Sequence, residues 1–300
     1  MKTTRALALA AAVAGAAVAA AGASAGHASS VCPNGQVRFG VEPYDSGPKF
    51  QGAYNALVKA VQTNLGCPVK LIVTNNYTAE VEAMRAKQLD VGEFGPLGYI
   101  FAHKLANAQP VAVFGTKQHR PVTYTAAIWV PSDSPIKSVK DLKGKTLALS
   151  DPASTSGSLF PRYALLTNGI NPNKDLKIQY AGGHPQSLLA LTNGKVDAAE
   201  VNSQQQATAA AAGQFDTSKY RRIWVSAPIP NDPITVRGDL DSAFKTAFAN
   251  ALFKLTPAQL KLVDTELGVD SGPMIAGKDS LYKQIRALVS TEHLGIKDIG

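Results

Sequence analysis

The stretch VKLIVTNNYTAEVEAMRAKQLDVGEF, residues 69–94, decides the fold that we expect for this chain. It begins with a β-rich run (69–73), continues with apolar residues at helical spacing over about 78–88, and ends in a short strand near 90–94. A strand–helix–strand unit of this kind joins two parallel strands through a helix. The stretch therefore predicts an α/β architecture.

A second stretch repeats this order. LKIQYAGGHPQSLLALTNGKVDAAEV (176–201) aligns with the first stretch without a gap when the chain is shifted by 107 residues, and the apolar positions coincide. Tyr77 falls on His184, each where a strand ends and a helix begins, and Glu93 falls on Glu200. Identity this low does not establish common descent, but it indicates two units of equivalent architecture.

Each unit is preceded by a further strand and helix. VRFGV (37–41) and a helical apolar stripe precede the first unit, and KTLALS (145–150) and a helix over about 157–168 precede the second. The order β-α-β-α-β predicts a parallel sheet with helices on its faces in each half of the chain. In open sheets of this type, ligands bind outside the carboxyl ends of the strands.

The two halves are connected twice. RPVTYTAAIWV (120–130) leads out of the first half, and RRIWVSAPIPNDPITV (221–236) leads back to it, which suggests a hinge. Helical segments follow to the C-terminus. We therefore expect a discontinuous first lobe, residues 26–122 plus 232–300, and a contiguous second lobe, residues 123–231.

The N-terminus has the pattern of a secretory signal peptide. A charged start is followed by an Ala/Val/Leu run and by the small-residue cleavage pattern Ala23-Ser24-Ala25. A transmembrane anchor is the alternative, and the Ala-rich run that ends in a cleavage site favours export with residues 1–25 removed. The residues before Cys32 are a poor match to a lipoprotein signal.

Composition narrows the function further. The chain has 300 residues, of which 17% are charged, and a formal net charge of +8 without a dense basic cluster interleaved with aromatic residues. Nucleic-acid binding is therefore not expected. The two cysteines, Cys32 and Cys67, each precede a strand of the first lobe, and an exported chain with an even count favours a disulfide over two free thiols. Their spacing matches no metal site.

The turn DPASTSG, residues 151–157, places three hydroxyl residues at the start of a helix. Backbone N–H groups at a helix N-terminus lack internal partners and bind oxyanions. One hydroxyl would suffice for a helix cap, so the local sequence leaves a cap and an anion cradle as equal alternatives. A serine nucleophile is disfavoured because this strand-to-helix turn does not have the G-x-S-x-G pattern of a nucleophile elbow.

Three motifs carry a family resemblance. DPASTSG (151–157), AGGH (181–184) and PIPNDPITVR (228–237) occur in the order seen in the substrate-binding proteins of phosphate/phosphite/phosphonate ABC transporters. VEAMRAKQLDVGEFGP (81–96) is similar to a motif in the first lobe of that family. The resemblance covers roughly residues 36–260.

The resemblance implies a fold and a function. The fold is the type II periplasmic binding-protein fold, with two α/β lobes and two hinge-strand crossovers. The protein would capture a small phosphorus oxyanion (phosphite, phosphonate or phosphate) in the cleft between the lobes and deliver it to the membrane permease of an ABC importer. We accordingly expect no enzymatic activity, no cofactor or metal, a monomer, and a location in the periplasm or cell envelope.

The resemblance also implies ligand contacts. Ser154, Thr155 and Ser156 would hold the oxyanion through hydroxyl and backbone N–H groups. Tyr77 would donate its phenol from the first lobe, and His184 would donate a ring N–H. Taken alone, each of these residues also has an ordinary structural interpretation, as a rim residue or a helix start.

Asp232 and two departures from the family pattern bear on the choice of ligand. Asp232 would accept the hydrogen of a P–OH group and so reject sulfate, which lacks that proton. Phe94 stands where some members have a second tyrosine, and Gln204 where some aminophosphonate binders have a carboxylate. Both changes favour a compact ligand over aminoethylphosphonate. Glu93 and Glu200 are interpreted as strand-end or surface acids.

Two other functions remain open from the sequence. An exported hydrolase or phosphoryl-handling enzyme could use His184 and a serine, although the sequence after the predicted signal peptide has neither a nucleophile elbow nor a His/Asp metal cluster. An oxyanion sensor that signals to a membrane kinase would have the same binding motifs as a transport receptor.

Overall fold

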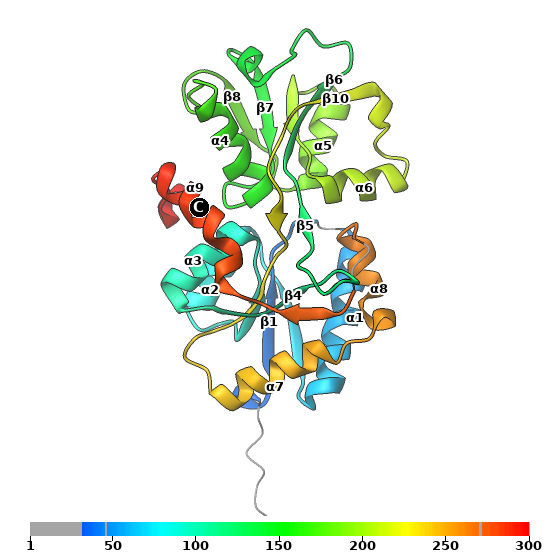
Figure 1. Ribbon diagram of the computed structural model, residues 1–300, viewed down its shortest axis with the longest axis vertical. Coiled ribbons are helices and arrows are strands. Elements are labelled where there is room, and N and C mark those ends of the chain that lie inside the picture. Colours follow the sequence, from blue (N-terminus) through cyan, green and yellow to red (C-terminus); the bar gives the residue numbers. More distant parts are fainter. Residues whose placement is uncertain (1–31, 46, 270–271, 300) are drawn as a thin grey trace, which may run out of the picture. The chain divides into compact units, whose positions relative to one another are not determined.

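The computed structural model describes residues 32–45, 47–269 and 272–299. The predicted signal peptide, residues 1–25, lies outside this range. The described chain contains two principal β-sheets, each flanked by helices (Figure 1). We refer to the six-stranded sheet with its helices as the first lobe and to the five-stranded sheet with its helices as the second lobe.

The first sheet contains the parallel strands predicted from the sequence. β1 (Val37–Val41) lies between β2 (Val69–Val73) and β3 (Val91–Glu93) and is parallel to both. Three further strands extend the sheet beyond β3 and make it mixed, in the order β12-β4-β13: β12 (Ile234–Val236), β4 (Gln109–Phe114) and β13 (Met274–Ala276).

The second sheet repeats the same arrangement. β7 (Thr146–Leu149) lies between β8 (Lys177–Tyr180) and β9 (Ala198–Glu200) and is parallel to both. The antiparallel strands β6 (Ala127–Pro131) and β10 (Tyr220–Val225) follow beyond β9. The strands of each βαβαβ unit are parallel, as predicted, and the further strands make both sheets mixed. The reason is that β12 and β6 follow the crossings from the opposite lobe and enter their sheets in the reverse direction.

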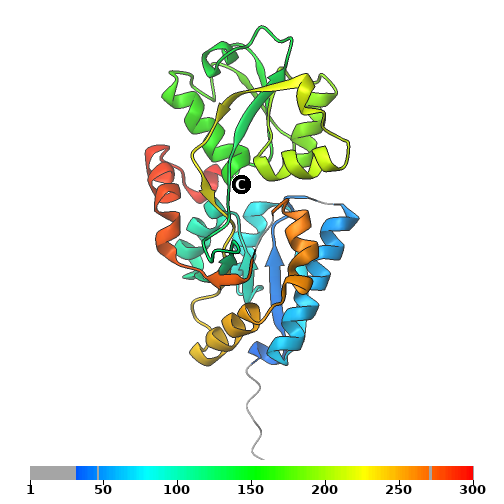
Figure 2. The same cartoon turned by 45° about the vertical axis from the view of Figure 1, so that its right-hand side comes forward.

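Helices cover both faces of the first sheet. One group shares a core that contains Phe50 and Phe248. Its first helix, α1 (Pro48–Leu65), begins at a proline and is followed by Gly66 in the left-handed conformation, a common helix end. The other group forms a second core that contains Tyr99 and Tyr282. The first group is α1 (Pro48–Leu65), α7 (Ser242–Phe253) and α8 (Pro257–Glu266), and the second is α2 (Tyr77–Arg85), α3 (Pro96–Ala106) and α9 (Lys283–Thr291) (Figure 2).

The second lobe has three α-helices and one π-helical turn. The turn η3 (Thr155–Leu159) leads directly into α4 (Phe160–Thr167), and both follow β7. The other two helices are α5 (His184–Thr192), which follows β8, and α6 (Ser203–Ala211), which follows β9. Each parallel strand of this lobe is thus followed by a helical segment whose start lies near the same sheet edge.

Two extended segments connect the lobes, as expected for the type II fold. β5 (Thr123–Tyr124) pairs with β11 (Ile229–Pro230) in a small antiparallel sheet between them (Figure 1). The fold class predicted from the sequence is therefore confirmed, whereas the exact lobe boundaries stay a prediction.

Cys32 and Cys67 form the predicted disulfide. Their Cα atoms are 5.8 Å apart, and the bridge lies beside the starts of β1 and β2, where Val37 pairs with Val69. The parallel pairing of these strands is what brings the two cysteines together.

We expect removal of this disulfide to lower stability. A bridge between residues 35 positions apart stabilises a protein by about 4 kcal/mol, chiefly by restricting the unfolded chain. The Cys32→Ser/Cys67→Ser protein should therefore unfold at a lower urea concentration than the oxidised parent protein. The reduced parent protein is the control and should unfold together with the double variant. Coincident transitions of the oxidised parent protein and the double variant would contradict the expectation.

Candidate functional site

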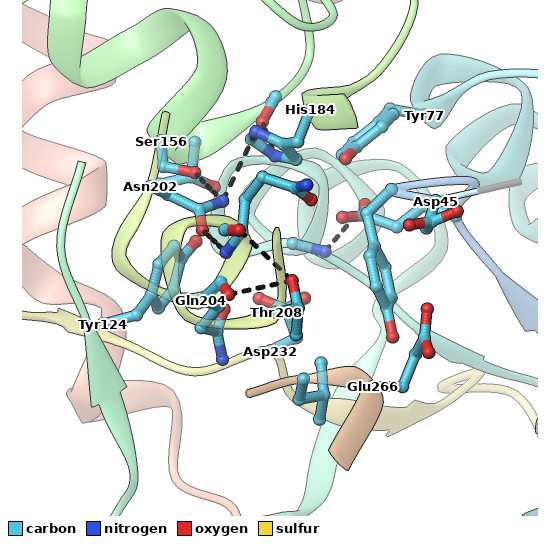
Figure 3. A pocket seen from close by; sticks show the side chains of 17 residues that line it. Asp45, Tyr77, Tyr124, Ser156, His184, Asn202, Gln204, Thr208, Asp232 and Glu266 are labelled. Atoms are coloured by element: carbon cyan, nitrogen blue, oxygen red, sulfur yellow. Dashed lines mark hydrogen bonds between the residues drawn. The ribbon is translucent and has the colours of Figure 1, made fainter. Parts of the chain in front are cut away.

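A cavity of about 40 Å³ lies where the carboxyl ends of the parallel strands of both lobes meet. A single ordered water needs about 10–15 Å³ by the same measure, so the cavity fits an occupant of a few heavy atoms. In Figure 3, His184 and Ser156 lie on one side of this cavity, and Tyr77 and Asp45 lie on another. The location agrees with the general rule for ligand sites in open α/β sheets.

The three hydroxyl residues of the turn after β7 line the cavity and are buried. Ser154 Oγ accepts a hydrogen bond from Gly157 N at 3.1 Å and so caps η3. Thr155 Oγ1 accepts from Leu97 N of the first lobe at 2.8 Å. A hydroxyl that accepts a bond keeps its own hydrogen for donation. Ser154 can therefore cap the turn and still donate to an oxyanion, so the two alternatives left by the sequence are compatible.

His184 is held in place by Glu200. Its Nδ1 lies 2.9 Å from Glu200 Oε2, which makes Nδ1 the donor to a carboxylate and directs Nε2 toward Ser154 Oγ, 3.4 Å away. Burial lowers the pKa of His184, but the charge and the hydrogen bond of Glu200 outweigh burial, and the pKa is raised above its ordinary value. The buried imidazole is thus positioned to donate a charge-assisted hydrogen bond into the cavity.

The first lobe contributes Tyr77 and a carboxyl group. Asn76 caps α2 by accepting from Ala79 N at 2.7 Å, and the helix therefore begins at Tyr77. The Tyr77 hydroxyl is buried, and the described residues give it no hydrogen-bond partner. Glu42, which follows β1 directly, also lines the cavity, and its Oε2 accepts from Gly95 N at 2.8 Å. Tyr77 is therefore an unused donor beside an acid.

Burial raises the pKa values of two acids at the cavity, Asp232 and Glu42. Burial raises the pKa of Asp232 to about 7, against the opposing charge of His184. Burial, followed by the charges of Asp232 and Glu80, raises the pKa of Glu42 well above its ordinary value. No Lys or Arg is among the described residues that line the cavity. The cavity can therefore bind an anion only through hydroxyls, N–H groups, an imidazolium and protonated carboxyls.

A second layer of acids lies behind the cavity wall. Glu93 is buried and accepts from Tyr54 OH at 2.9 Å, and burial, followed by the charge of Asp232, raises its pKa to about 8. Both oxygens of the buried Glu80 lack hydrogen-bond partners in the part of the chain that is described. Glu93 and Glu200 do end their strands, but neither is a surface acid. The surface interpretation was wrong because helices cover both strand ends.

Seven of the eight predicted ligand-binding residues line this one cavity. Gln204 reaches it from α6, where its Nε2 lies 3.3 Å from Asn231 Oδ1. The other six come from both lobes and from the segment before β12: Tyr77, Ser154, Thr155, Ser156, His184 and Asp232. Their roles as ligand contacts stay predictions.

Phe94 is the exception. Its ring is completely buried in the core of the first lobe and does not line the cavity. The ring occupies the space beside Gly92 and Gly98, which have no side chains. A Cβ atom at Gly92 would lie 2.6 Å from Phe94 Cε2. The expected placement of Phe94 at the ligand is therefore corrected. The ring turns toward the helices because two glycines leave room for it there.

The sequence interpretation missed several residues of the site. Glu42 and Asn202 each follow a parallel strand within two residues, so a strict application of the strand-end rule would have found them. Asn202 caps α6 and places its Nδ2 3.3 Å from Ser156 Oγ. Tyr124 comes from the crossing strand β5, and Glu266 comes from α8. The sequence contains no local signal for these last two residues.

Comparison with known proteins is consistent with this geometry. Residues 39–282 match the family model described as ABC transporter, phosphonate, periplasmic substrate-binding protein. The chain is 28% identical to the phosphonates-binding periplasmic protein of Escherichia coli over 87% of this chain and 81% of that protein. It is 27% identical to the phosphate-import protein PhnD of Mycolicibacterium smegmatis over 61% of this chain and 60% of that protein.

A solved structure shares the fold. PhnD1 of Prochlorococcus marinus, in complex with methylphosphonate, superimposes with a TM-score of 0.76 at 21% identity, covering 87% of this chain and 99% of that one. None of the helices within residues 32–45, 47–269 and 272–299 is both long and apolar enough to cross a bilayer. The family model covers most of the chain and both walls of the cavity, and the chain therefore belongs to the family of periplasmic substrate-binding proteins of phosphonate ABC transporters.

Proposed function

We propose that this protein is a non-enzymatic receptor for a small phosphorus oxyanion outside the cytoplasm, and that it delivers this ligand to an ABC importer. One observation carries the proposal: the buried hydroxyl turn and His184 of the second lobe face Tyr77 and Asp232 across one small cavity. Hydroxyl, N–H and imidazolium donors suit the P–O⁻ oxygens, and a carboxyl group suits a P–OH group.

Closure of the lobes would complete the site. The bond from Leu97 N to Thr155 Oγ1 already joins the first lobe to the oxyanion turn of the second. A ligand enclosed in this way would be shielded from water, which strengthens each of its hydrogen bonds. We propose that residues 26–122 with 232–300 and residues 123–231 move as the two lobes, that residues 1–25 direct export, and that the receptor acts as a monomer.

Calorimetric titration of the chain from Gly26 onward, freed of ligand by partial unfolding and refolding, tests the proposal. The titrants are phosphate, phosphite, methylphosphonate, aminoethylphosphonate and sulfate. We expect micromolar or tighter binding of at least one phosphorus oxyanion and no binding of sulfate. Absence of binding to every phosphorus oxyanion by the folded protein would refute the proposed function.

The Ser154→Ala variant tests the role of the turn. Loss of one hydroxyl bond to a charged ligand weakens binding by about 1.5–3 kcal/mol, or roughly 10- to 150-fold. Ser158→Ala is the matched control, because Ser158 is a buried serine of the same turn that bonds to Tyr180 OH and does not line the cavity. We expect the control to bind as the parent protein does. Equal losses in both variants would show that the turn acts only on the fold.

A further inference from the structure

Glu42 has a free oxygen at the cavity. Its carboxyl group is 3% exposed, and Oε2 is engaged by Gly95 N. No hydrogen bond from the described residues reaches Oε1. A Cβ atom at position 95 would lie 2.8 Å from this oxygen. The Glu42 carboxyl can occupy its present position because residue 95 is a glycine. Glu42 therefore has one acceptor bonded within the protein and one available to an occupant.

Two carboxyl groups consequently share one small site. Glu42 and Asp232 both line the cavity, and the charge of Asp232 acts on Glu42 strongly enough to raise its pKa. The other titratable groups that act on Glu42 are Glu80 of α2 and Asp151 of the turn after β7, and Tyr77 lies beside it. In the empty cavity the raised pKa values favour carboxyls that keep their own protons, whereas an occupant with two hydroxyl groups can donate one hydrogen bond to each carboxylate.

Phosphorus oxyanions differ in how many such hydroxyl groups they carry. The phosphate monoanion carries two P–OH groups and can satisfy both carboxyls. The monoanions of methylphosphonate and phosphite carry one P–OH group, and their remaining substituent is a methyl group or a hydrogen, neither of which bonds to a carboxyl. A buried polar group left without a partner costs about 1–3 kcal/mol, or roughly 5- to 150-fold in affinity.

The cavity wall has few apolar side chains that could contact a methyl group of the ligand. Leu267 is the only aliphatic side chain among the described residues that line it, and the other lining side chains are polar or tyrosine rings. Phe94, which could have contacted a P–H or P–C bond, turns into the core instead. Sites built to bond a hydroxyl reject analogues that lack it far more strongly than apolar pockets discriminate by size.

We propose that Glu42 is a specificity-determining residue that makes this site prefer inorganic phosphate, with two hydroxyl groups, to alkylphosphonates and phosphite. The inference rests on the proposed function, because it assigns the ligand of that same site. Asp232 selects for the first ligand hydroxyl, and Glu42 selects for the second.

The test is the ratio of the dissociation constants of methylphosphonate and phosphate. We expect a ratio of about 10 or more in the parent protein and a ratio near or below 1 in Glu42→Leu, whose side chain accepts no hydrogen and contacts a methyl group. Glu292→Leu is the matched control, since the Glu292 side chain belongs to the same lobe, is 1% exposed, pairs with Arg162 and does not line the cavity. Its ratio should equal that of the parent protein.

Gly95→Ala provides a second variant should Glu42→Leu fail to fold. The alanine Cβ atom would displace the carboxyl group of Glu42, although Glu42 itself is retained. The ratio of the methylphosphonate to the phosphate dissociation constant should therefore fall, as in Glu42→Leu. A ratio near 1 in the parent protein, or a ratio unchanged in either folded variant, overturns the role of Glu42 and leaves the receptor function in place. Failure of the parent protein to bind either ligand overturns both.

Discussion

Replacing His184 with asparagine should weaken phosphate binding by about 100-fold, because the variant loses a charge-assisted hydrogen bond in a buried site. Among the described residues that line the cavity, His184 is the only side chain that can become a cation near neutral pH. Its Nε2 side faces the oxyanion turn, whereas Nδ1 is bonded to Glu200. Isothermal titration calorimetry at pH 6 measures the loss directly.

Glu200→Gln should weaken phosphate binding less than the His184 substitution does, and it should also shift the pH dependence of binding. Glu200 does not line the cavity, so it acts through the imidazole as a positioning residue. Its carboxylate raises the pKa of His184, and without it the imidazolium would lose its proton at a lower pH. We therefore expect the pH above which phosphate binding weakens to move downward, together with a loss of about ten-fold at neutral pH.

The matched control for this substitution is Glu82→Gln. Glu82 lies on α2, is partly exposed, pairs with Arg85 and does not line the cavity. Phosphate binding by this variant should keep the pH profile of the parent protein. A profile unchanged in Glu200→Gln, or shifted equally in both variants, would show that Glu200 does not act through His184.

The ligand-free protein should be more stable at pH 5 than at pH 8. An acid whose pKa is higher in the folded than in the unfolded state makes folding less favourable as the pH rises from its ordinary pKa through its folded value. Burial and then the charge of Asp232 raise the pKa of Glu93 to about 8, and burial raises that of Asp232 to about 7. Burial also raises the pKa values of Glu42 and Glu80 well above the ordinary range.

Other titrating groups do not reverse this trend. The raised pKa of His184 gives stability that is present below its ordinary pKa and lost as the pH rises, the same sign as for the buried acids. Hydrogen bonds from Lys87 and Arg237 lower the pKa of Asp239 to about 2, so its contribution is lost only in strong acid. We expect the free energy of unfolding to fall by an amount on the order of 3 kcal/mol or more between pH 5 and pH 8.

Urea unfolding at pH 5, 6, 7 and 8 measures how the free energy of unfolding depends on pH. The Glu80→Gln variant shows how much of this dependence comes from Glu80. The glutamine resembles the protonated glutamate at every pH. The variant should therefore match the parent protein at pH 5 and exceed its stability at pH 8. Glu82→Gln is the control, because Glu82 lies on the same helix, is partly exposed, and bonds to Arg85. Stability that rises from pH 5 to pH 8 would contradict a protonated acid cluster.

The sequence by itself determined the architecture and located seven of the residues that line the cavity. Apolar periodicity is a local property, and it located the two βαβ units and the strands that bring Cys32 close to Cys67. It also identified Tyr77 and His184 as equivalent positions, each at the start of a helix. The carboxyl ends of parallel strands converge on one edge of a sheet, so motifs at those ends could be assigned to one site before any contact was known.

Only the tertiary structure decided which way the side chains at those ends point. Phe94 and Glu93 are neighbours at the end of β3, yet neither lines the cavity, because the ring fills the space left by two glycines and the carboxyl bonds to Tyr54. Glu42 follows a strand in the same way and does line it. Burial and packing, which depend on residues far apart in the chain, set these orientations and the protonation of the acids, whereas the local sequence sets only the positions of the strands that carry them.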